Sequence, residues 1–182
     1  MISGYMAQKG PMTRIFDQEA KQKGVTTLKV IPVTVTRIIS NTKVQVAYGK
    51  NHHKEFEVTG DQCPKVGDII TPDLVFQEGD RVMVTGISKG RGFAGVLKRH
   101  GFHRQPVTGG QSDRTRAPGA VGAQTPGKIV KGKKMPGHYG NKTQTIKGLK
   151  IVALLKDKNQ IIVSGPVPGA PNSWILIRKN KK

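Results

Sequence analysis

"KVQVAYG", residues 43–49, has Val44, Val46 and Tyr48 at every second position, alternating with Lys43, Gln45 and Ala47. An alternation with a period of two, rich in β-branched residues, indicates a strand with one buried face. The same pattern recurs in two further segments, KEFEV (residues 54–58) and DRVMVTG (residues 80–86). The N-terminal part of the chain is therefore predicted to consist of strands.

A longer run of strand-forming residues, TTLKVIPVTVTRIIS (26–40), is interrupted by Pro32. Because proline cannot donate a hydrogen bond to a sheet ladder, Pro32 predicts an edge position or a bulge. Near the C-terminus, LKIVALLKDKNQIIVSG (149–165) predicts a hairpin with its turn near KDKN, and SWILIRK (173–179) predicts a final strand with Trp174 in the core. Many short strands joined by Gly/Pro turns favour a mainly β fold, as a small antiparallel β-barrel.

The middle of the chain, residues 86–148, has a different composition. It holds 13 lysines and arginines, 14 glycines and a single acid, Asp113, and so accounts for +12 of the formal net charge of +20. Only GFAGVLKRHGF (92–102) has the composition of a short helix. A segment with so few apolar residues and so high a charge cannot offset its own ordering entropy. We expect one β-barrel domain from residues 1–85 and 149–182, with 86–148 as an extended loop that orders against a polyanion.

The excess of positive charge restricts the class of partner. Nucleic acid, an anionic membrane and an acidic protein all suit it, and a basic domain favours nucleic acid. The sequence contains neither an amphipathic helix for a membrane surface nor a long recognition helix for a DNA groove. It also contains no readable secretory signal and no apolar run long enough to span a membrane. Its single cysteine, Cys63, excludes an internal disulfide framework.

Unpaired, irregular RNA is the predicted partner, because its backbone is tracked by cations and its loose bases stack on rings. The candidate phosphate ligands are the cations of the middle segment: Lys89, Arg91, Lys98, Arg99, Arg104, Arg114, Arg116, Lys128, Lys131, Lys133 and Lys134. The rings and the remaining cation among the candidates are Phe93, Phe102, Tyr139, His100, His103, His138 and Lys142. The candidates for close approach of backbone to phosphate are Gly90, Gly92 and Gly132.

The sequence motifs give little support to other functions. GRGFAG (90–95) matches a dinucleotide glycine motif but lacks a βαβ context, and GKIVKGKK (127–134) resembles a Walker A loop without its hydroxyl residue. Histidine spacing alone is a weak zinc signal. No nucleophile, base and orienting acid can be assembled, so we expect no enzyme, no cofactor, no metal and no small-molecule substrate. A free RNA chaperone and a nucleotide-binding enzyme are the alternatives.

Four segments together resemble one family. They are MTRIF (12–16), SKGRGFAGVLKRHGF (88–102), RAPGAVG (116–122) and TPGKIVKGKKMPGHYG (125–140). Their content and order resemble the bacterial type of the ribosomal protein L3 family of the large subunit, over nearly the whole chain. The resemblance implies a barrel related to that of translation factors and a loop that runs through ribosomal RNA (rRNA) towards the peptidyl transferase centre. It also implies an early role in subunit assembly, neighbours from the L-fourteen and L-nineteen families, and a place in a cytoplasmic or organellar ribosome.

The sequence departs from the family pattern at several points. Pro11 stands where relatives have glycine before MTRIF, which removes a backbone donor from the first strand. Two residues separate Gly122 from Thr125 where bacterial relatives have three, so the loop tip (Ala123, Gln124 and Thr125) is shortened. Gln124 matches the glutamine that is N5-methylated in some relatives and is the candidate modification site. A surface insertion around GKNHHKEFEV is also missing.

Overall fold

The computed structural model describes residues 2–16, 20–58, 64–111, 113–125 and 127–180. Cys63 lies outside these residues. The chain divides into two compact units, and each is described by itself. The globular unit comprises Met1–Ser88 and Lys142–Lys182, and the basic unit comprises Lys89–Asn141.

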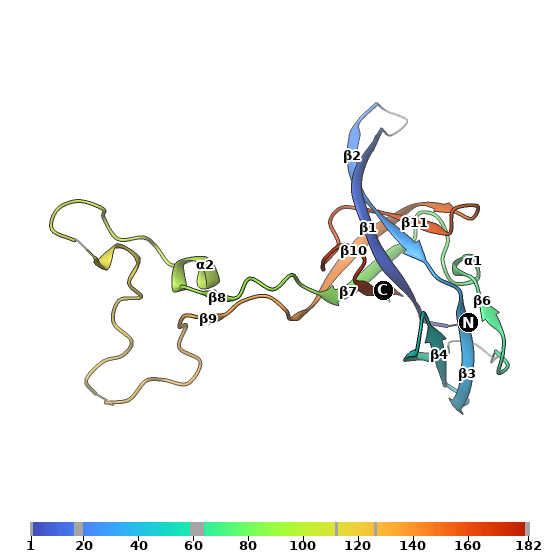
Figure 1. The fold of residues 1–182 in the computed structure, drawn as a ribbon, viewed down its shortest axis with the longest axis horizontal. Coiled ribbons are helices and arrows are strands. Elements are labelled where there is room, and N and C mark those ends of the chain that lie inside the picture. The colour runs from blue at the N-terminus through green and yellow to red at the C-terminus, as the bar shows by residue number, and fades with distance from the viewer. Residues whose placement is uncertain (1, 17–19, 59–63, 112, 126, 181–182) are drawn as a thin grey trace. The chain divides into compact units, whose positions relative to one another are not determined.

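Six antiparallel strands form a ring in the globular unit (Figure 1). In order around the ring they are β1 (Gly4–Phe16), β12 (Trp174–Lys179), β7 (Arg81–Ile87), β10 (Thr143–Leu155), β11 (Gln160–Ser164) and β2 (Gln22–Val30). The ring closes because β2 pairs with β1 as well as with β11. The mainly β class predicted from the alternating pattern is confirmed.

The predicted C-terminal hairpin is confirmed. Leu155 of β10 pairs with Gln160 of β11, and the turn between them is closed by the Asn159 N–H, which donates to the Lys156 carbonyl at 3.1 Å. Asn159 has a φ of 49°, a left-handed conformation that asparagine tolerates better than most residues. The KDKN segment therefore supplies both the reversal and the residue type that it requires.

A second sheet has the order β5 (His52–Glu57), β4 (Lys43–Tyr48), β3 (Val33–Ser40) and β6 (Ile69–Ile70), and a short helix, α1 (Pro72–Val75), follows it. Val44, Val46 and Phe56 are buried, as their alternation predicted. They share one apolar core with Val82 and Val84 of the ring. Burial of each such side chain contributes about 1.5–3 kcal/mol before the entropy cost.

The expectation for Pro32 is wrong. Residues 26–40 do not form one strand with a proline at an edge or in a bulge. Strand β2 ends at Val30 and β3 begins at Val33, and the two strands belong to different sheets. Pro32 lies in the link between them, where a missing N–H leaves no ladder bond unmade. Pro11, by contrast, lies inside β1 where the register to β2 shifts between Lys9 and Met12, so its missing donor falls at an irregularity.

Trp174 is half-buried against the core, as predicted, and its ring meets the edge of Tyr48 at a centroid distance of 4.8 Å. Near it, the Lys9 Nζ donates to the carbonyls of Val167 and Gly169 at 2.6 and 2.8 Å. These two bonds hold the GPVPGAPN loop, which has little regular structure of its own, against strand β1.

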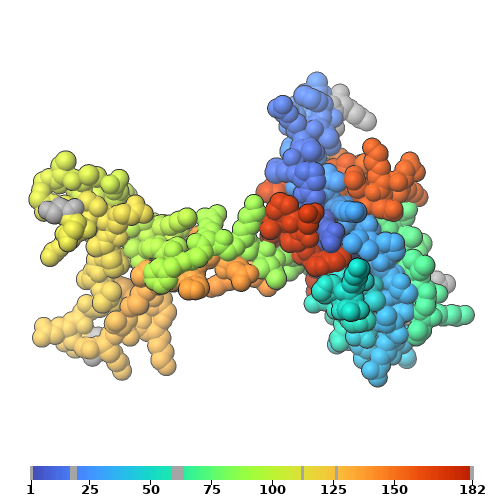
Figure 2. All heavy atoms as spheres, viewed as in Figure 1, coloured from blue at the N-terminus to red at the C-terminus, as the bar shows by residue number. Residues whose placement is uncertain are grey.

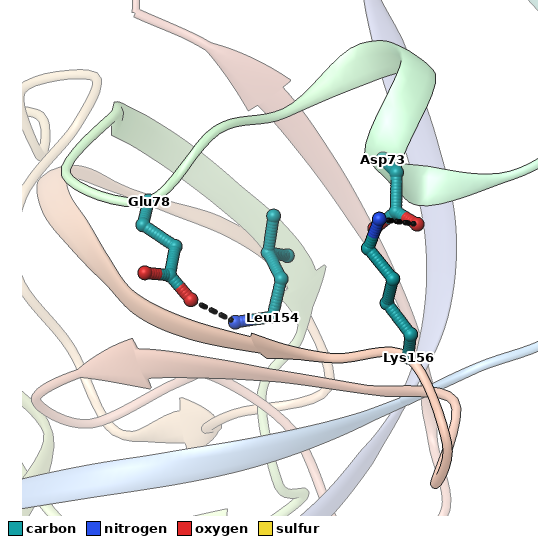
Figure 3. A network of polar contacts seen from close by, with 4 residues as sticks. All are labelled: Asp73, Glu78, Leu154 and Lys156. Carbon is teal, nitrogen blue, oxygen red and sulfur yellow. Dashed lines mark hydrogen bonds and ion pairs between the residues drawn. The ribbon is translucent and has the colours of Figure 1, made fainter.

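A polar network holds the β10–β11 hairpin against the segment around α1 (Figure 3). The Lys156 ammonium lies 3.3 Å from the Asp73 carboxylate of α1, and the Leu154 N–H donates to the Glu78 carboxylate at 3.0 Å. The Asp73–Lys156 pair is largely exposed and adds little stability by itself. The bond from Leu154 has a charged acceptor, and such bonds are stronger than neutral ones.

The basic unit contains two short strands, β8 (Phe93–Ala94) and β9 (Gly137–His138), the helix α2 (Val96–His100) and a 3-10 turn, η1 (Arg114–Arg116). The helix confirms the one predicted within residues 92–102. Beyond α2 and β9 the chain forms thin arms, visible in Figure 2 in yellow and orange. Across the described parts of the chain, no helix is long and apolar enough to cross a membrane.

Candidate nucleic-acid interface

The two ends of the basic unit pair with each other and form a stem. Strand β8 is antiparallel to β9, with Phe93 opposite His138. The Arg91 N–H donates to the Tyr139 carbonyl at 2.8 Å, and the Tyr139 N–H donates to the Gly92 carbonyl at 2.9 Å. The end of the middle segment thus has a partner strand in residues 91–94.

Helix α2 is held between two glycines. Gly95 is its N-cap, and Gly101 ends it in a left-handed conformation with a φ of 70°. The Arg99 N–H donates to the Gly95 carbonyl at 2.9 Å. On the inner side, Ala94 and Val96 are almost fully buried, and they are the small apolar centre of this unit.

Two basic side chains of α2 converge on one backbone oxygen, which we call the Met135 clasp. The Arg99 Nη1 donates to the Met135 carbonyl at 2.7 Å, and the His100 Nε2 lies 3.0 Å from the same oxygen. The guanidinium fills the space beside Gly137: a Cβ at that position would lie 2.6 Å from Nη1. The clasp thus connects α2 to the returning arm, and Gly137 leaves the room that Arg99 occupies.

The ring side chains of the stem lie around β8 and β9. The Phe93 ring is 72% exposed and meets the His138 ring edge to face at 6.1 Å. The Arg91 guanidinium lies over the Tyr139 ring, 5.1 Å from its centroid, within cation–π range. Phe93 is thus the ring of the stem that offers the most open face for a base to stack on.

Ten predicted phosphate ligands are exposed cations: Lys89, Arg91, Lys98, Arg104, Arg114, Arg116, Lys128, Lys131, Lys133 and Lys134. Arg99 differs from them, because it is half-buried and bonded within the clasp. Lys142 is exposed but belongs to the globular unit, where its N–H donates to the Ser88 hydroxyl at 3.2 Å. The structure therefore separates the predicted set into exposed cations and one architectural arginine.

The other predicted residues lie on open parts of the unit. His103 is exposed, Phe102 is half-buried with its ring 6.1 Å from that of His100, and the tip residues Ala123, Gln124 and Thr125 are all exposed. Gly92 and Gly132 have left-handed backbones, with φ of 63° and 82°, and a Cβ at either would meet no atom within 4 Å. Gly90 is similarly open, with Asn141 at 3.8 Å. Space for a close backbone approach is thus present at all three glycines.

The geometry does not support the nucleotide-binding alternatives. A dinucleotide site requires a strand, the glycine turn, a helix and a parallel strand. Here the glycines of GRGFAG flank a two-residue strand that pairs antiparallel with β9, and the helix that follows has five residues. GKIVKGKK lies in an irregular part of the arm, and no strand leads into it. Among the described residues, no group of three His, Cys, Asp or Glu side chains could hold a metal ion.

The Met135 clasp could not be predicted from the sequence. Arg99 and Met135 are 36 residues apart, and the acceptor is a backbone carbonyl, which has no signature in the sequence. The one available signal was Gly137, a glycine directly after Met135-Pro136 that no turn requires.

Comparison with known proteins points to a single family. Residues 10–166 match the family model described as "Ribosomal protein L3". The "Large ribosomal subunit protein uL3" of Dehalococcoides mccartyi is 38% identical over 206 residues, which cover all of both chains. The proteins of the same name from Herpetosiphon aurantiacus and Roseiflexus sp. are 36% and 38% identical, covering 100% and 98% of this chain and 98% of each relative. The chain belongs to the ribosomal protein L3 family, in the form found in bacteria.

Proposed function

We propose that the chain is a structural, non-enzymatic constituent of the large ribosomal subunit, and that its basic unit binds large-subunit rRNA. One observation supports the RNA-binding part of the proposal: ten exposed cations lie along the basic unit, seven of them on arms with almost no apolar interior, in a segment with a single acid. Such arms suit a path between phosphate backbones, where each cation replaces condensed counterions. Family membership supports the large subunit as the source of that RNA.

The two units take different parts in this proposal. The six-stranded ring of the globular unit serves as the small barrel of translation-protein type that anchors the chain at the outside of the subunit. The basic unit, Lys89–Asn141, is the loop that runs inward, and its tip at Ala123, Gln124 and Thr125 approaches the peptidyl transferase centre. The protein joins the subunit early in assembly, near the 3′ end of the rRNA, and its protein neighbours come from the L-fourteen and L-nineteen families. The site of action is the ribosome of the bacterial cytoplasm.

Individual residues have distinct parts in RNA binding. The exposed cations neutralise phosphates, while Phe93 offers an open ring to an unpaired base and His103 and His138 offer donors to phosphates or bases. Arg99 and His100 act through the clasp, because both are bonded to Met135. Gln124, exposed at the tip, is the candidate for N5-methylation, and the intact mass of its peptide tests this: an increase of about 14 Da, one added methyl, is expected.

The test is the salt dependence of binding to a transcript of the large-subunit rRNA. If about ten phosphate contacts form, the logarithm of the affinity falls with the logarithm of the salt concentration at a slope of about −7 to −9. Replacing Lys128, Lys131, Lys133 and Lys134 by glutamine should reduce the slope by about 3–4, roughly one unit for each lysine.

A matched control removes the same charge from the globular unit. Lys43, Lys50, Lys54 and Lys65 are exposed lysines of that unit. Replacing these four by glutamine should leave the slope within about one unit of the wild-type value. Equal reductions in both variants would show that binding follows net charge alone, and a slope near zero in the wild type would refute the electrostatic account.

A further inference from the structure

Strands β1 and β2 continue as a two-stranded ribbon after their other partners have ended. Strand β12 pairs with β1 only from Gly4 to Gln8, and β11 pairs with β2 only from Val25 to Lys29. Beyond these partners, Arg14, Ile15 and Phe16 of β1 pair with Gly24, Lys23 and Gln22 of β2, and all six residues except Ile15 are exposed. Figure 2 shows this ribbon, in blue, standing out from the rest of the globular unit.

The register of the ribbon collects three side chains on one face. Met12, Arg14 and Phe16 alternate along β1, so they point to the same side of it. Their partners on β2 are Thr26, Gly24 and Gln22. Because Gly24 has no side chain, the Met12 methyl lies over it, 3.2 Å from where a Cβ would stand. We call the surface of Met12, Arg14, Phe16 and Gln22 the ribbon face.

The ribbon face is costly to leave in water. Met12 is 57% exposed and Phe16 is 71% exposed. A two-stranded ribbon without a third strand or a packed face is marginally stable by itself. Exposed large apolar side chains that share a face mark interaction surfaces more often than scattered ones do. Something that covers this face would stabilise both the apolar side chains and the ribbon that carries them.

The composition of the face indicates what covers it. Methionine, phenylalanine and arginine are enriched in protein–protein interfaces, and lysine is depleted there. The ribbon face holds all three of the enriched types and no lysine, whereas the arms of the basic unit bear many cations between glycines. A single cation neutralises one phosphate and would contribute little to RNA affinity. The face therefore favours a protein partner over RNA.

Arg14 indicates the chemistry of that partner. With the Gln22 amide oriented so that its oxygen faces the guanidinium, Arg14 donates to it from Nε at 3.2 Å and from Nη1 at 3.0 Å. The neutral amide holds the guanidinium in place, and none of the acids among the described residues pairs with it. A fixed guanidinium is suited to a carboxylate. Pro11 has no N–H, which makes an added strand along this part of β1 less favourable, so we place the partner on the face.

We propose that the ribbon face is a docking surface for a neighbouring protein of the large subunit, through a segment that carries a carboxylate between apolar side chains. The carboxylate pairs with Arg14, and the apolar side chains cover Met12 and Phe16. This inference rests on the proposed function, because the neighbour is a subunit protein.

Photocrosslinking in assembled subunits tests the proposal. The substitution Phe16→p-benzoylphenylalanine places a photoreactive ring on the ribbon face of the full-length chain, in cells where it is the sole copy. Subunits are purified on a gradient, irradiated and digested, and the adducts are identified by mass spectrometry. The expected result is one dominant adduct to an apolar residue near an acid in another subunit protein. An adduct to rRNA alone, or none in subunits that contain the chain, would overturn the proposal.

Further variants separate the possible outcomes. Thr13→p-benzoylphenylalanine lies on the opposite face of the ribbon and should not form the same adduct. Adding Arg14→Glu to the Phe16 probe should lower the adduct yield at least about tenfold, and Arg14→Lys should lower it less. If the Phe16 probe is not incorporated, Gln22→p-benzoylphenylalanine probes the same face. A chain that never enters the subunit would refute the proposed function itself, whereas entry followed by crosslinking to RNA would refute only the docking partner.

Discussion

Substitution of Gly137 by alanine should release the Met135 clasp without otherwise disturbing the basic unit. The added Cβ would lie 2.6 Å from the Arg99 Nη1 and 3.2 Å from its Cζ. The φ of Gly137 is not in the left-handed region, so alanine fits the backbone there. The guanidinium is the free end of a flexible side chain, so it moves aside and gives up its 2.7 Å bond to the Met135 carbonyl.

The size of the effect follows from that bond. A hydrogen bond to a charged group contributes about 1.5–3 kcal/mol. The lower chain entropy of alanine in the unfolded state offsets about 0.4–1 kcal/mol of the loss. The net cost is therefore about 1–2 kcal/mol, which increases the open fraction of the stem about 5- to 30-fold.

Amide hydrogen exchange on the full-length chain measures this opening directly. The reporters are the Arg91 and Tyr139 amides, which bond across the stem at 2.8 and 2.9 Å. Both should exchange about 5- to 30-fold faster in Gly137→Ala. Gly122→Ala is the matched control, because a Cβ at Gly122 would meet only the Lys128 carbonyl oxygen, at 3.7 Å, and its φ is not in the left-handed region.

A double-mutant cycle identifies the cause. If Gly137→Ala acts by displacing the guanidinium, then Arg99→Met should have a similar effect, and the double variant should be no worse than either single one. Exchange in Gly137→Ala that matches the Gly122→Ala control would refute the clasp as the element that holds the stem. So would additive losses in the double variant, because they would place the two residues in separate interactions.

Three further predictions concern the globular unit. Burial raises the pKa of Tyr5, so stability should be full below the ordinary value near 10 and fall as the pH rises above it. Tyr5→Phe should reduce this fall, with the remainder coming from Tyr48, whose pKa burial also raises, and should cost about 1 kcal/mol at neutral pH, as urea unfolding at several pH values would show. The Gln77 N–H and then the Lys179 ammonium lower the pKa of Asp80, so Asp80→Asn should be less stable at neutral pH, and the difference from the wild type should shrink as the pH falls below the ordinary carboxyl value near 4. Lys9→Met should cost about 1–3 kcal/mol in the same measurement, because two carbonyls of the GPVPGAPN loop lose their donor; an unchanged unfolding midpoint would contradict this.

The strands could be predicted from the sequence because their signal is local. Val44, Val46 and Phe56 alternate with polar neighbours, and the structure buries all three. The arrangement of those strands could not be predicted, because it depends on partners far apart in the chain. Gly4 pairs with Arg178, for example, and no local pattern records that register. The same limit explains Pro32, which reads locally as an irregularity within one strand and in fact lies between two sheets.

The candidate nucleic-acid interface also has a part that could be predicted from the sequence and a part that could not. Composition was sufficient to identify the basic segment and its cations, since their number does not depend on how the arms fold. Arg99 differs from the exposed cations because it bonds the Met135 carbonyl, which lies within reach only when β8 and β9 pair. From composition alone, Arg99 was therefore predicted to bind phosphate like Arg104 or Lys98. Contact of the exposed cations with phosphate stays a prediction.

The most direct test of the central claim is sedimentation of a bacterial lysate through a sucrose gradient at high salt with magnesium, followed by detection of the chain across the fractions. We expect the chain to comigrate with the large subunit after the salt wash, because arms held between RNA helices would have to break many phosphate contacts at once to dissociate. Recovery of the chain near the top of the gradient, with intact large subunits elsewhere, would contradict it.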